Sequence, residues 1–387
     1  MSEGMNPTGN TVVQLVDALL ARAIGRKASD IHFEPSDGGM WVRYRLDGLL
    51  HEMDRLPAGL AENVIARLKI LAGLLTYRMD IPQEGAFQAQ GHLTGGLPPI
   101  DVRVATFPTV RGERAVVRLM YAVGQVSALD DLGFSDEVVT EFRRAAEQPH
   151  GLILVTGPAG SGKSTTLYAL ARHIRAATPG RSVVSLEDPV EQRVDGMAQI
   201  QIQPHGELDY VRAMRSLLRQ DVQVLLVGEI RDAQTARVVI EAALTGHLIM
   251  STLHSGDPAE AVVRLLEMGV EAYQIVGALS LVFTQRLVRL ICDACGGRGC
   301  EVCAETGYLG RTACGQIAVM NESIRQAILD HRPVGELRDA IAVDRADLAA
   351  DARRLIEQGQ TTVDEVRRVL GSLFACGEPG RRSPARH

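Results

Sequence analysis

The stretch GPAGSGKSTTLYAL, residues 157–170, decides the fold prediction for this chain of 387 residues. It fits the pattern G-x-x-x-x-G-K-[ST], in which a glycine-rich loop binds phosphate groups through its backbone N–H groups. A short apolar segment, residues 152–155, precedes the loop, and a helical pattern follows it. A buried strand, a glycine-rich loop and a helix in this order favour a nucleotide-binding site over an ordinary turn before a helix.

Each residue type in the loop has an expected part in binding a nucleotide. The glycines open backbone conformations that other residues avoid, Lys163 would neutralise the β and γ phosphates, and the Ser164 hydroxyl would ligate Mg²⁺. The predicted cofactor-binding residues here are Gly157, Pro158, Ala159, Gly160, Ser161, Gly162, Lys163, Ser164 and Thr165. ATP and Mg²⁺ are the expected ligands.

Composition and charge narrow the function classes. The chain has 41 basic and 47 acidic residues, a net charge of −6, and 46% hydrophobic residues. This balance gives no basic surface for nucleic acid, so no nucleic-acid partner is expected. The first residues lack the pattern of a signal peptide, and no apolar run approaches the roughly 18 residues of a membrane span. We therefore expect a cytoplasmic protein.

The order of elements predicts an α/β protein with more than one domain. After the loop, strands at 182–186, 222–227 and 248–252 alternate with helices at 163–176, 208–218, 233–244 and 258–268, which predicts a parallel sheet covered on both faces. Residues past the cysteines are predicted to be helical. The predicted parts are an α+β domain at 11–122, a linker at 123–132, the nucleotide-binding domain at 133–291, a cysteine subdomain at 292–312, a C-terminal helical region at 313–376 and a flexible tail at 377–387.

Acidic residues follow two of the predicted strands at the edge that carries the loop. Glu187 follows the strand at 182–186, and Glu229 follows the apolar residues of VQVLLVGEIRD. Hydrolysis of ATP needs one carboxylate for the metal and another, or the same one, to orient the attacking water. Glu187 and Glu229 are the predicted catalytic acids; the alternative is that they only cap the helices that follow.

Histidines and arginines supply further candidates. His247 and His254 bracket the strand at 248–252, and His254 could hydrogen-bond a γ-phosphate, although a lone histidine is more often structural. Arg103 and Arg118 lie with Arg111 and Arg114 on the last predicted hairpin of the first domain. Such charges usually form a solvated face, but they could reach a nucleotide as arginine fingers.

Four of the six cysteines lie between residues 292 and 303. They form two C-x-x-C pairs, Cys292 with Cys295 and Cys300 with Cys303, joined by a glycine-rich turn. In a reducing compartment this spacing favours a tetrahedral zinc site over disulfides, with free thiols as the alternative. Such a closed site would be structural.

Taken together, these motifs resemble the secretion traffic ATPases that assemble type II secretion pseudopili and type IV pili. The matching stretches run in unbroken order over about residues 20–315. They are ASDIHFEP, VRYRLDG, DVRVATFP, GERAVVRL, GPAGSGKSTTLYAL, EDPVE, LLRQDVQVLLVGEIRDAQTA, ALTGHLIMSTLHS, TQRLVRLIC and GYLGRT.

The resemblance implies a RecA-like P-loop core joined to a smaller PAS-like α+β domain and a Cys₄ zinc subdomain, assembled as a homohexamer that contacts an inner-membrane platform protein. It implies that Lys163, Ser164 and Glu229 serve phosphate and magnesium, that Glu187 belongs to an acidic box and that His247 and His254 form a histidine box. It further implies that Arg103 and Arg118 meet the nucleotide from the smaller domain.

Two departures from the family pattern stand out. Only about ten residues precede the first matched helix, where the family commonly has an amino-terminal docking domain, so docking by that route is not expected. Gln223 stands where the family usually has an aspartate.

The expected function is an ATP-driven motor for pseudopilin or pilin assembly. The alternatives are a nucleotide-gated scaffold with little turnover and a RecA-like nucleic-acid motor.

Overall fold

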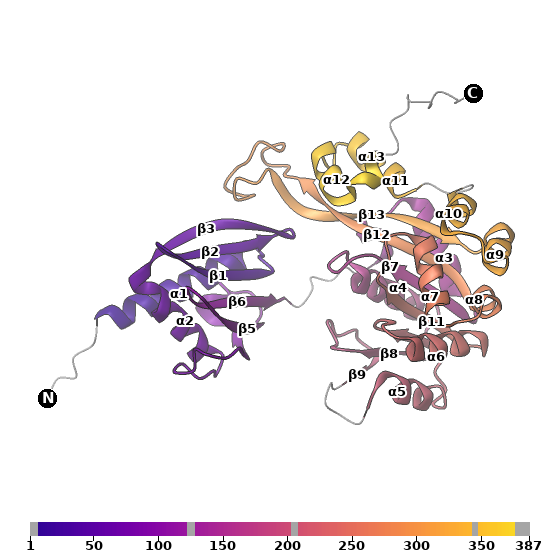
Figure 1. The fold of residues 1–387 in the computed structure, drawn as a ribbon, viewed down its shortest axis with the longest axis horizontal. Helices are drawn as coiled ribbons and strands as arrows, with labels where there is room; N and C mark the ends of the chain where they lie inside the picture. Colours follow the sequence, from indigo (N-terminus) through magenta and orange to yellow (C-terminus); the bar gives the residue numbers. More distant parts are fainter. Residues whose placement is uncertain (1–6, 122–127, 203–207, 343–346, 376–387) are drawn as a thin grey trace. The chain divides into compact units, whose positions relative to one another are not determined.

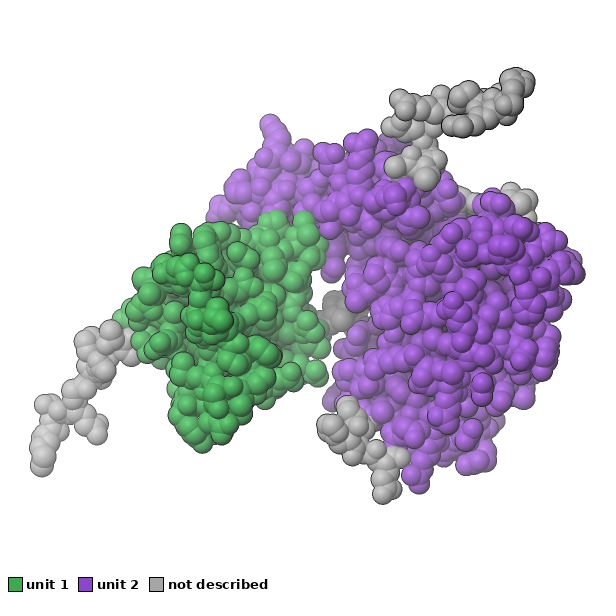
Figure 2. All heavy atoms as spheres, in the orientation of Figure 1, with its two compact units in different colours: residues 1–124 green, residues 125–387 purple. Residues whose placement is uncertain are grey.

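The computed structural model describes residues 7–121, 128–202, 208–342 and 347–375. The chain divides into two compact units, Met1–Gly124 and Gln125–His387, which are coloured separately in Figure 2. The predicted linker at 123–132 lies partly outside the described residues, and the predicted tail at 377–387 lies wholly outside them.

Unit 1 is an α+β domain built on a six-stranded antiparallel sheet in the order β3-β2-β1-β6-β5-β4 (Figure 1). Its elements are α1 (Pro7–Gly25), β1 (Asp30–Ser36), β2 (Gly39–Leu46), β3 (Leu49–Pro57), α2 (Ala58–Leu71), β4 (Gln83–Ala89), the 3₁₀ turn η1 (Gly91–Leu93), β5 (Ile100–Thr109) and β6 (Gly112–Met120). The sequence analysis did not predict the edge strand β3, whose residues show no regular alternation of apolar and polar side chains.

The two faces of this sheet differ sharply. Along β5 every second residue, including Val102 and Val104, is buried against the helical side, and the hydroxyl of Tyr44 donates to the Leu19 carbonyl of α1 at 2.7 Å. The opposite face carries charged side chains, among them Arg103 and Arg118, which are register partners on β5 and β6. Alternation of apolar and polar residues therefore produces one packed face and one charged face.

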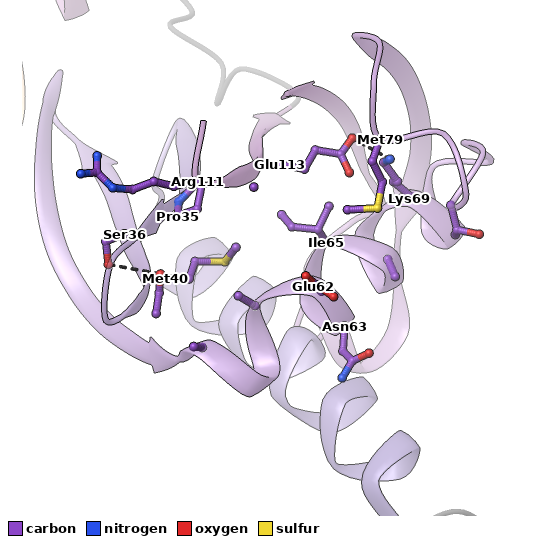
Figure 3. A pocket seen from close by; sticks show the side chains of 16 residues that line it. Pro35, Ser36, Met40, Glu62, Asn63, Ile65, Lys69, Met79, Arg111 and Glu113 are labelled. Atoms are coloured by element: carbon purple, nitrogen blue, oxygen red, sulfur yellow. Dashed lines mark hydrogen bonds and ion pairs between the residues drawn. The ribbon is translucent and has the colours of Figure 1, made fainter. Parts of the chain in front are cut away.

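Unit 1 also contains a cavity of about 370 Å³ between α2 and the turns that join β1 to β2 and β5 to β6. Lys69 and Glu113 line it, and Figure 3 shows their side chains pointing toward each other. Both are buried, with Lys69 Nζ 2.6 Å from a Glu113 carboxylate oxygen and 2.7 Å from the Arg78 carbonyl. Because a buried charge is costly without a partner, this pair and the Arg78 carbonyl hold the segment after α2 against the helix.

Unit 2 is an α/β domain with a seven-stranded sheet in the order β13-β12-β7-β11-β10-β8-β9 (Figure 1). All neighbours are parallel except β12 and β13, which pair antiparallel. Its elements are the 3₁₀ turn η2 (Leu129–Leu132), α3 (Asp136–Glu147), β7 (Gly151–Thr156), α4 (Lys163–Ala177), β8 (Val183–Glu187), β9 (Ala198–Gln201), α5 (Tyr210–Leu217), β10 (Val224–Val227), α6 (Ala233–Leu244), β11 (Leu248–Leu253), α7 (Pro258–Glu267), α8 (Ala272–Ala278), β12 (Leu279–Ile291), β13 (Tyr308–Val319), α9 (Glu322–Leu329), α10 (Val334–Ala342), α11 (Leu348–Glu357), α12 (Val363–Leu370) and α13 (Ser372–Ala375).

Both faces of the central strands are buried, which explains their continuous apolar runs. In β7, Leu152 and Leu154 face a cluster that includes residues of α5 to α10, whereas Ile153 and Val155 face a cluster formed with α3 and α4. Every residue of β7, β10 and β11 is buried. Burial on two sides is the property of a parallel sheet covered by helices, as predicted.

The prediction that the chain is helical past the cysteines is wrong at its start. Residues 308–319 form β13, which pairs with β12 over most of its length, and the helices begin only at α9. Cys314 and Ile317 of β13 are buried by contacts with residues far away in the sequence. Such pairing leaves little local signal, because a strand is stabilised by its neighbours.

The sequence predicts two helix caps: Ser135 can cap a helix that runs to about Glu147, and Thr362 with Glu365 three residues later fits a capping box. The Ser135 side chain caps α3 by accepting from the Val138 N–H, as predicted. Thr362 caps α12 by accepting from the Glu365 N–H, but the Glu365 carboxylate accepts bonds from Arg289 and Arg368. The predicted capping box is therefore present on the threonine side only.

Candidate nucleotide-binding site

The glycine-rich loop joins β7 to α4 and has the backbone of an anion-binding loop. Gly157, Gly160 and Gly162 have φ of +143°, +74° and +89°, the region in which glycine is favoured. Among the described residues, the N–H groups of residues 162–165 have no hydrogen-bond acceptor. Unpaired N–H groups at the start of a helix of 15 residues attract phosphate oxygens.

Lys163 lies across this loop. Its Nζ donates to the carbonyls of Gly157 at 2.9 Å and Pro158 at 3.0 Å. Burial lowers the pKa of the Lys163 ammonium, while the Glu229 carboxylate acts in the opposite direction. Two neutral carbonyls therefore hold the amine over the loop. A phosphate group could replace them, because its negative charge makes it a stronger acceptor.

Glu229 and His254 come from two neighbouring strands and meet beside the loop. His254 Nε2 lies 3.0 Å from Glu229 Oε1, and His254 Nδ1 lies 3.1 Å from the Gly157 carbonyl. Arg231 Nε donates to Glu229 Oε2 at 2.9 Å, and this bond raises the pKa of the guanidinium. Both ring nitrogens of His254 thus face acceptors, which links Glu229 to the loop by a continuous chain of polar contacts.

Glu187 lies at the same edge of the sheet in a different environment. It is only 5% exposed, and its carboxylate accepts bonds from the hydroxyls of Tyr168 and Ser185 and from Gln199 Nε2. Burial, followed by the bond to Glu187, raises the pKa of the Tyr168 phenol. The donors belong to α4, β8 and β9, so Glu187 joins these elements.

The remaining predicted residues are not all gathered at this edge. His247 precedes β11, where its Nδ1 lies 3.2 Å from the Ala242 carbonyl, whereas His254 follows the other end of that strand. Arg103 and Arg118 belong to unit 1, where Arg118 Nε donates to Asp30 at 2.9 Å. The Arg118 side chain is 63% exposed.

Two predicted residues of the loop, Ser164 and Thr165, are half-buried in the first turn of α4. Gln223 lies at the far end of β10, where its Oε1 accepts from the Ser182 N–H.

The sequence analysis missed residues of β12 that contact the loop. Gln285 Nε2 donates to the Ser161 carbonyl at 2.6 Å, and Thr284 Oγ1 lies 2.5 Å from Thr156 Oγ1. Arg286 donates to the Gly256 carbonyl at 2.9 Å, and burial lowers the pKa of its guanidinium. The available signal was a polar Thr-Gln-Arg run inside an apolar segment, but its place in the sheet was not apparent from the motif.

The four cysteines form one cluster between β12 and β13. Their Sγ atoms lie within 4.8 Å of one another, with separations of 3.9 Å for Cys292–Cys300, 3.9 Å for Cys295–Cys303 and 3.7 Å for Cys300–Cys303. A tetrahedral site with Zn–S bonds of about 2.3 Å places its sulfurs about 3.8 Å apart. The cluster therefore fits a metal ion held by four thiolates.

Backbone N–H groups support this cluster. Those of Cys300 and Gly307 donate to Cys303 Sγ at 3.2 and 3.3 Å. Although burial opposes the change, these bonds and the neighbouring thiols lower the pKa of Cys303 to about 6. A cysteine with a lowered pKa supplies the thiolate that a metal ion requires.

A glycine-rich loop at the carboxyl edge of a parallel sheet, with a lysine in it and an acid–histidine pair beside it, defines the class of P-loop α/β proteins. Within that class the chain belongs to the family described as type II/IV secretion system protein, whose model matches residues 7–368.

The names of proteins with similar sequences agree with this family. The type II secretion system protein HxcR of Pseudomonas aeruginosa is 39% identical over 372 residues, which cover 93% of this chain and 78% of HxcR. The type II secretion system ATPase E of Vibrio cholerae is 36% identical over 92% of this chain and 75% of its own length. The type IV pilus assembly ATPase PilB of Thermus thermophilus is 38% identical over 91% of this chain but only 42% of its own length.

Solved structures agree on the fold. The ATPase DotB of Legionella pneumophila superposes with a TM-score of 0.70 at 22% identity, covering 94% of this chain and 96% of DotB. The pilus retraction motor PilT superposes with a TM-score of 0.61 at 22% identity, covering 91% of this chain and 96% of PilT. These superpositions and the two sheets confirm the predicted fold, an α/β P-loop core with a smaller α+β domain, and the four cysteines form the predicted cluster.

No helix among the described residues combines the length and the apolar character that crossing a membrane requires.

Proposed function

We propose that this chain binds ATP at the loop between β7 and α4 and hydrolyses it. The observation that carries the proposal is the contact chain from Arg231 through Glu229 and His254 to the loop, next to N–H groups that have no acceptor within the described chain. These residues lie at the carboxyl edge of the parallel sheet, where ligands bind in open α/β sheets.

The residues of the loop have distinct proposed roles. The N–H groups of residues 162–165 bind the phosphate oxygens, and Lys163 exchanges its two loop carbonyls for the β and γ phosphates. Ser164 and Glu229 would hold Mg²⁺, which neutralises charge on the phosphates when it is bound. The site thus concentrates positive partners where charge develops during hydrolysis.

Two acids compete for the role of orienting the attacking water. The Glu229 side chain is 19% exposed and contacts His254, which can itself form a hydrogen bond to the γ-phosphate. Glu187 accepts three bonds from its own domain, so we assign it a smaller direct role and Glu229 the larger one. His247, which lies at the other end of β11, would act across an interface between subunits.

The arginines of unit 1 are the proposed fingers. Arg103 is exposed and, among the described residues, has no ion-pair or hydrogen-bond partner, and Arg118 is exposed despite its bond to Asp30. Available guanidinium groups on a second unit suit a nucleotide site that is completed by another domain or subunit. A homohexameric ring is the assembly we propose for this arrangement.

We propose further that the ring is cytoplasmic and is bound to the inner membrane through a platform protein, where turnover drives assembly of pseudopilins or pilins. The names of relatives in type II secretion and type IV pilus assembly support this direction. The four-cysteine cluster would hold zinc as a structural ion, since four thiolates leave no open position for a substrate.

The test is Lys163→Ala in the full chain, with Lys27→Ala as a control of the same residue type on an exposed site of unit 1. We expect phosphate release from ATP to fall at least about 100-fold in K163A and to stay near wild type in K27A, with secretion or piliation failing in parallel. Nucleotide-dependent assembly of the wild type without phosphate release would favour a scaffold instead. Turnover that rises only with DNA would favour a nucleic-acid motor.

A further inference from the structure

Strand β12 brings a buried glutamine against the phosphate loop. Thr284 is the register partner of Thr156, the last residue of β7, so Gln285 is the next residue along β12, beside the start of the loop. Gln285 is 1% exposed. A buried carboxamide must have partners for both its ends, and here both partners belong to the loop and its helix.

The two bonds of Gln285 reach the residues on either side of the stretch 162–165. Its Nε2 donates to the Ser161 carbonyl at 2.6 Å, and its Oε1 accepts from the Thr166 hydroxyl at 2.8 Å. The carbonyl can only accept, so the orientation of the carboxamide is determined by chemistry. Gln285 therefore joins the loop at Ser161 to the first turn of α4 at Thr166.

Two glycines of the motif are shaped around the same residue. A Cβ atom at Gly157 would lie 2.5 Å from the Gln285 carbonyl oxygen, and one at Gly162 would lie 2.9 Å from Gln285 Nε2. Contacts that short do not occur for real side chains, so these glycines are required by the approach of β12 as well as by their φ angles. The loop is wrapped closely around Gln285.

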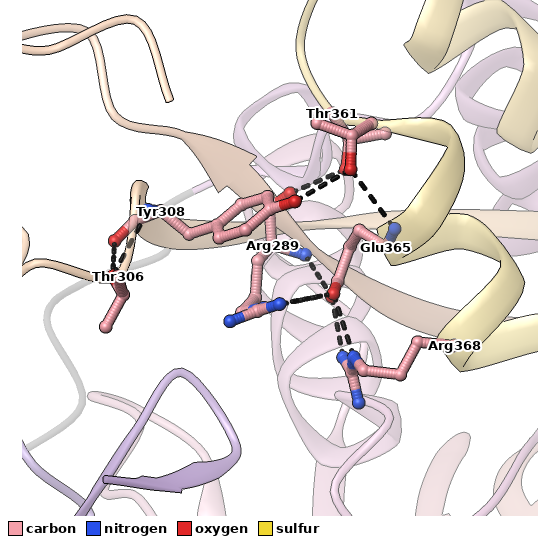
Figure 4. Close-up of polar contacts among 7 residues, drawn as sticks. Arg289, Thr306, Tyr308, Thr361, Glu365 and Arg368 are labelled. Atoms are coloured by element: carbon pink, nitrogen blue, oxygen red, sulfur yellow. Dashed lines mark hydrogen bonds and ion pairs between the residues drawn. The ribbon is translucent and has the colours of Figure 1, made fainter. Parts of the chain in front are cut away.

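The strand that carries Gln285 is itself held at its far end. Arg289 forms buried bonds to Glu365 of α12 at 2.7 and 3.0 Å, and Thr361 donates to the Arg289 carbonyl at 2.8 Å (Figure 4). The Ile291 N–H donates to the Gln360 carbonyl at 2.9 Å, next to the first cysteine of the cluster. A positioning group is effective only when its own support is rigid, and these bonds supply that rigidity.

We propose that Gln285 is a positioning residue for nucleotide binding: its carboxamide holds the phosphate loop in its binding shape before any nucleotide arrives. This proposal rests on the proposed function, because it assumes that the loop binds a nucleotide. A loop that visits its binding shape only part of the time has its affinity reduced by that fraction. Gln285 keeps the fraction high by bonding two points that flank the free N–H groups.

The experiment compares three variants of the full chain. Gln285→Met keeps the length of the side chain and removes both bonds, whereas Thr166→Val removes the bond at α4 and also the longer contact of the Thr166 hydroxyl to the Gly162 carbonyl at 3.3 Å. Thr284→Val is the matched control, because it removes a buried bond between β12 and β7 that does not reach beyond Thr156. Dissociation constants are measured with a fluorescent ADP analogue, and hydrogen exchange of the amides of residues 157–166 is followed without nucleotide.

We expect Q285M to bind the analogue at least about tenfold more weakly than T284V and to exchange its loop amides faster, with T166V between them. Equal affinity and equal exchange in Q285M and T284V would overturn the positioning role, even where the wild type binds nucleotide. A wild type that does not bind the analogue would refute the proposed function, and loop exchange would then still test whether Gln285 orders the loop. If Q285M fails to fold, T166V decides the question against T284V by the same two readouts.

Discussion

Two acidic residues at one edge of the unit 2 sheet occupy very different surroundings. Glu187 ends β8 and Glu229 follows β10, the neighbouring strand. Glu187 is buried and accepts bonds from Tyr168, Ser185 and Gln199. Glu229 has a side chain 19% exposed and faces one arginine and one histidine.

The difference lies in the partners. The donors of Glu187 are neutral groups on elements of its own half of the sheet, so its carboxylate links α4, β8 and β9 by hydrogen bonds. The partners of Glu229 are side chains that can carry charge, and one of them also touches the loop at Gly157. An acid that connects to the loop suits catalysis, whereas an acid enclosed by neutral donors suits stability.

The largest effect is expected from Glu229→Gln. The amide cannot act as a base or ligate a cation as a carboxylate does, so we expect turnover of ATP to fall by about 100- to 10,000-fold while nucleotide binding stays within about threefold. Steady-state phosphate release and binding of a fluorescent nucleotide measure the two quantities. Arg231→Ala is the control, because it removes a partner of Glu229 and keeps the carboxylate. If E229Q turned over ATP faster than R231A, Glu229 would not be the catalytic acid, and its contrast with Glu187 would fail.

How much of this was predictable differs along the chain. The loop, the strands β7, β8, β10 and β11 and the caps by Ser135 and Thr362 follow from patterns within a few residues. Gly157, Gly160 and Gly162 were identified because positive φ is favoured by glycine. Local rules predicted these features because the interactions that create them are themselves local.

Features that depend on pairing between distant segments were not predicted. Gln285 was missed because its role exists only through the register of β12 with β7 and the bonds to Ser161 and Thr166. His247 and His254 share one motif, but a strand of six residues, about 20 Å long, separates them. This separation follows from the predicted strand at 248–252, which the two histidines bracket in the sequence.

The environment of an acid was equally invisible in the sequence. The neutral donors of Glu187 come from α4 and β9 as well as from its own strand. Glu365 matched a capping box, yet its carboxylate is bound by Arg289, 76 residues away in sequence, and by Arg368. In both cases the residue type was a correct signal of importance, while the partner that defines its role was supplied by the tertiary fold.

Glu365 sharpens the comparison, because it is as buried as Glu187 but faces cations (Figure 4). Burial alone would raise its pKa, but the bonds from Arg368 and Arg289 prevail and lower the pKa to about 2 from its usual 4.5. A lowered folded pKa stabilises the fold above the unfolded pKa, and this contribution is lost as the pH falls from about 4.5 through about 2. Glu365→Gln should therefore cost about 3 kcal/mol of unfolding free energy at pH 6 and almost nothing at pH 2.

Urea unfolding of wild type and E365Q at a series of pH values measures this gap. Acid affects the cysteine cluster of both proteins equally, so the difference between them isolates Glu365. A gap that stays constant between pH 6 and pH 2 would mean that the ionised carboxylate is not the stabilising group.

The smallest effect is expected from Glu187→Gln. One end of the amide can no longer accept, so one of three buried donors loses its partner, at a cost of about 1–3 kcal/mol in unfolding free energy. Tyr168→Phe removes the phenol that donates to Glu187 and should cost about 1 kcal/mol. For folded E187Q we expect turnover within about tenfold of wild type, because no bond of Glu187 reaches the phosphate loop among the contacts of the described residues.

Turnover decides between the two roles, since stability alone does not. Y168F leaves the carboxylate in place and removes one donor to it, together with the acceptor of the Glu191 and Gln192 N–H groups. A structural role of Glu187 therefore predicts similar, modest losses of activity in Y168F and E187Q. A catalytic acid predicts instead that E187Q loses about 100-fold or more while Y168F stays near wild type. The second pattern would show that Glu187 exchanges its neutral donors for water during turnover, and the contrast with Glu229 would then describe only the nucleotide-free chain.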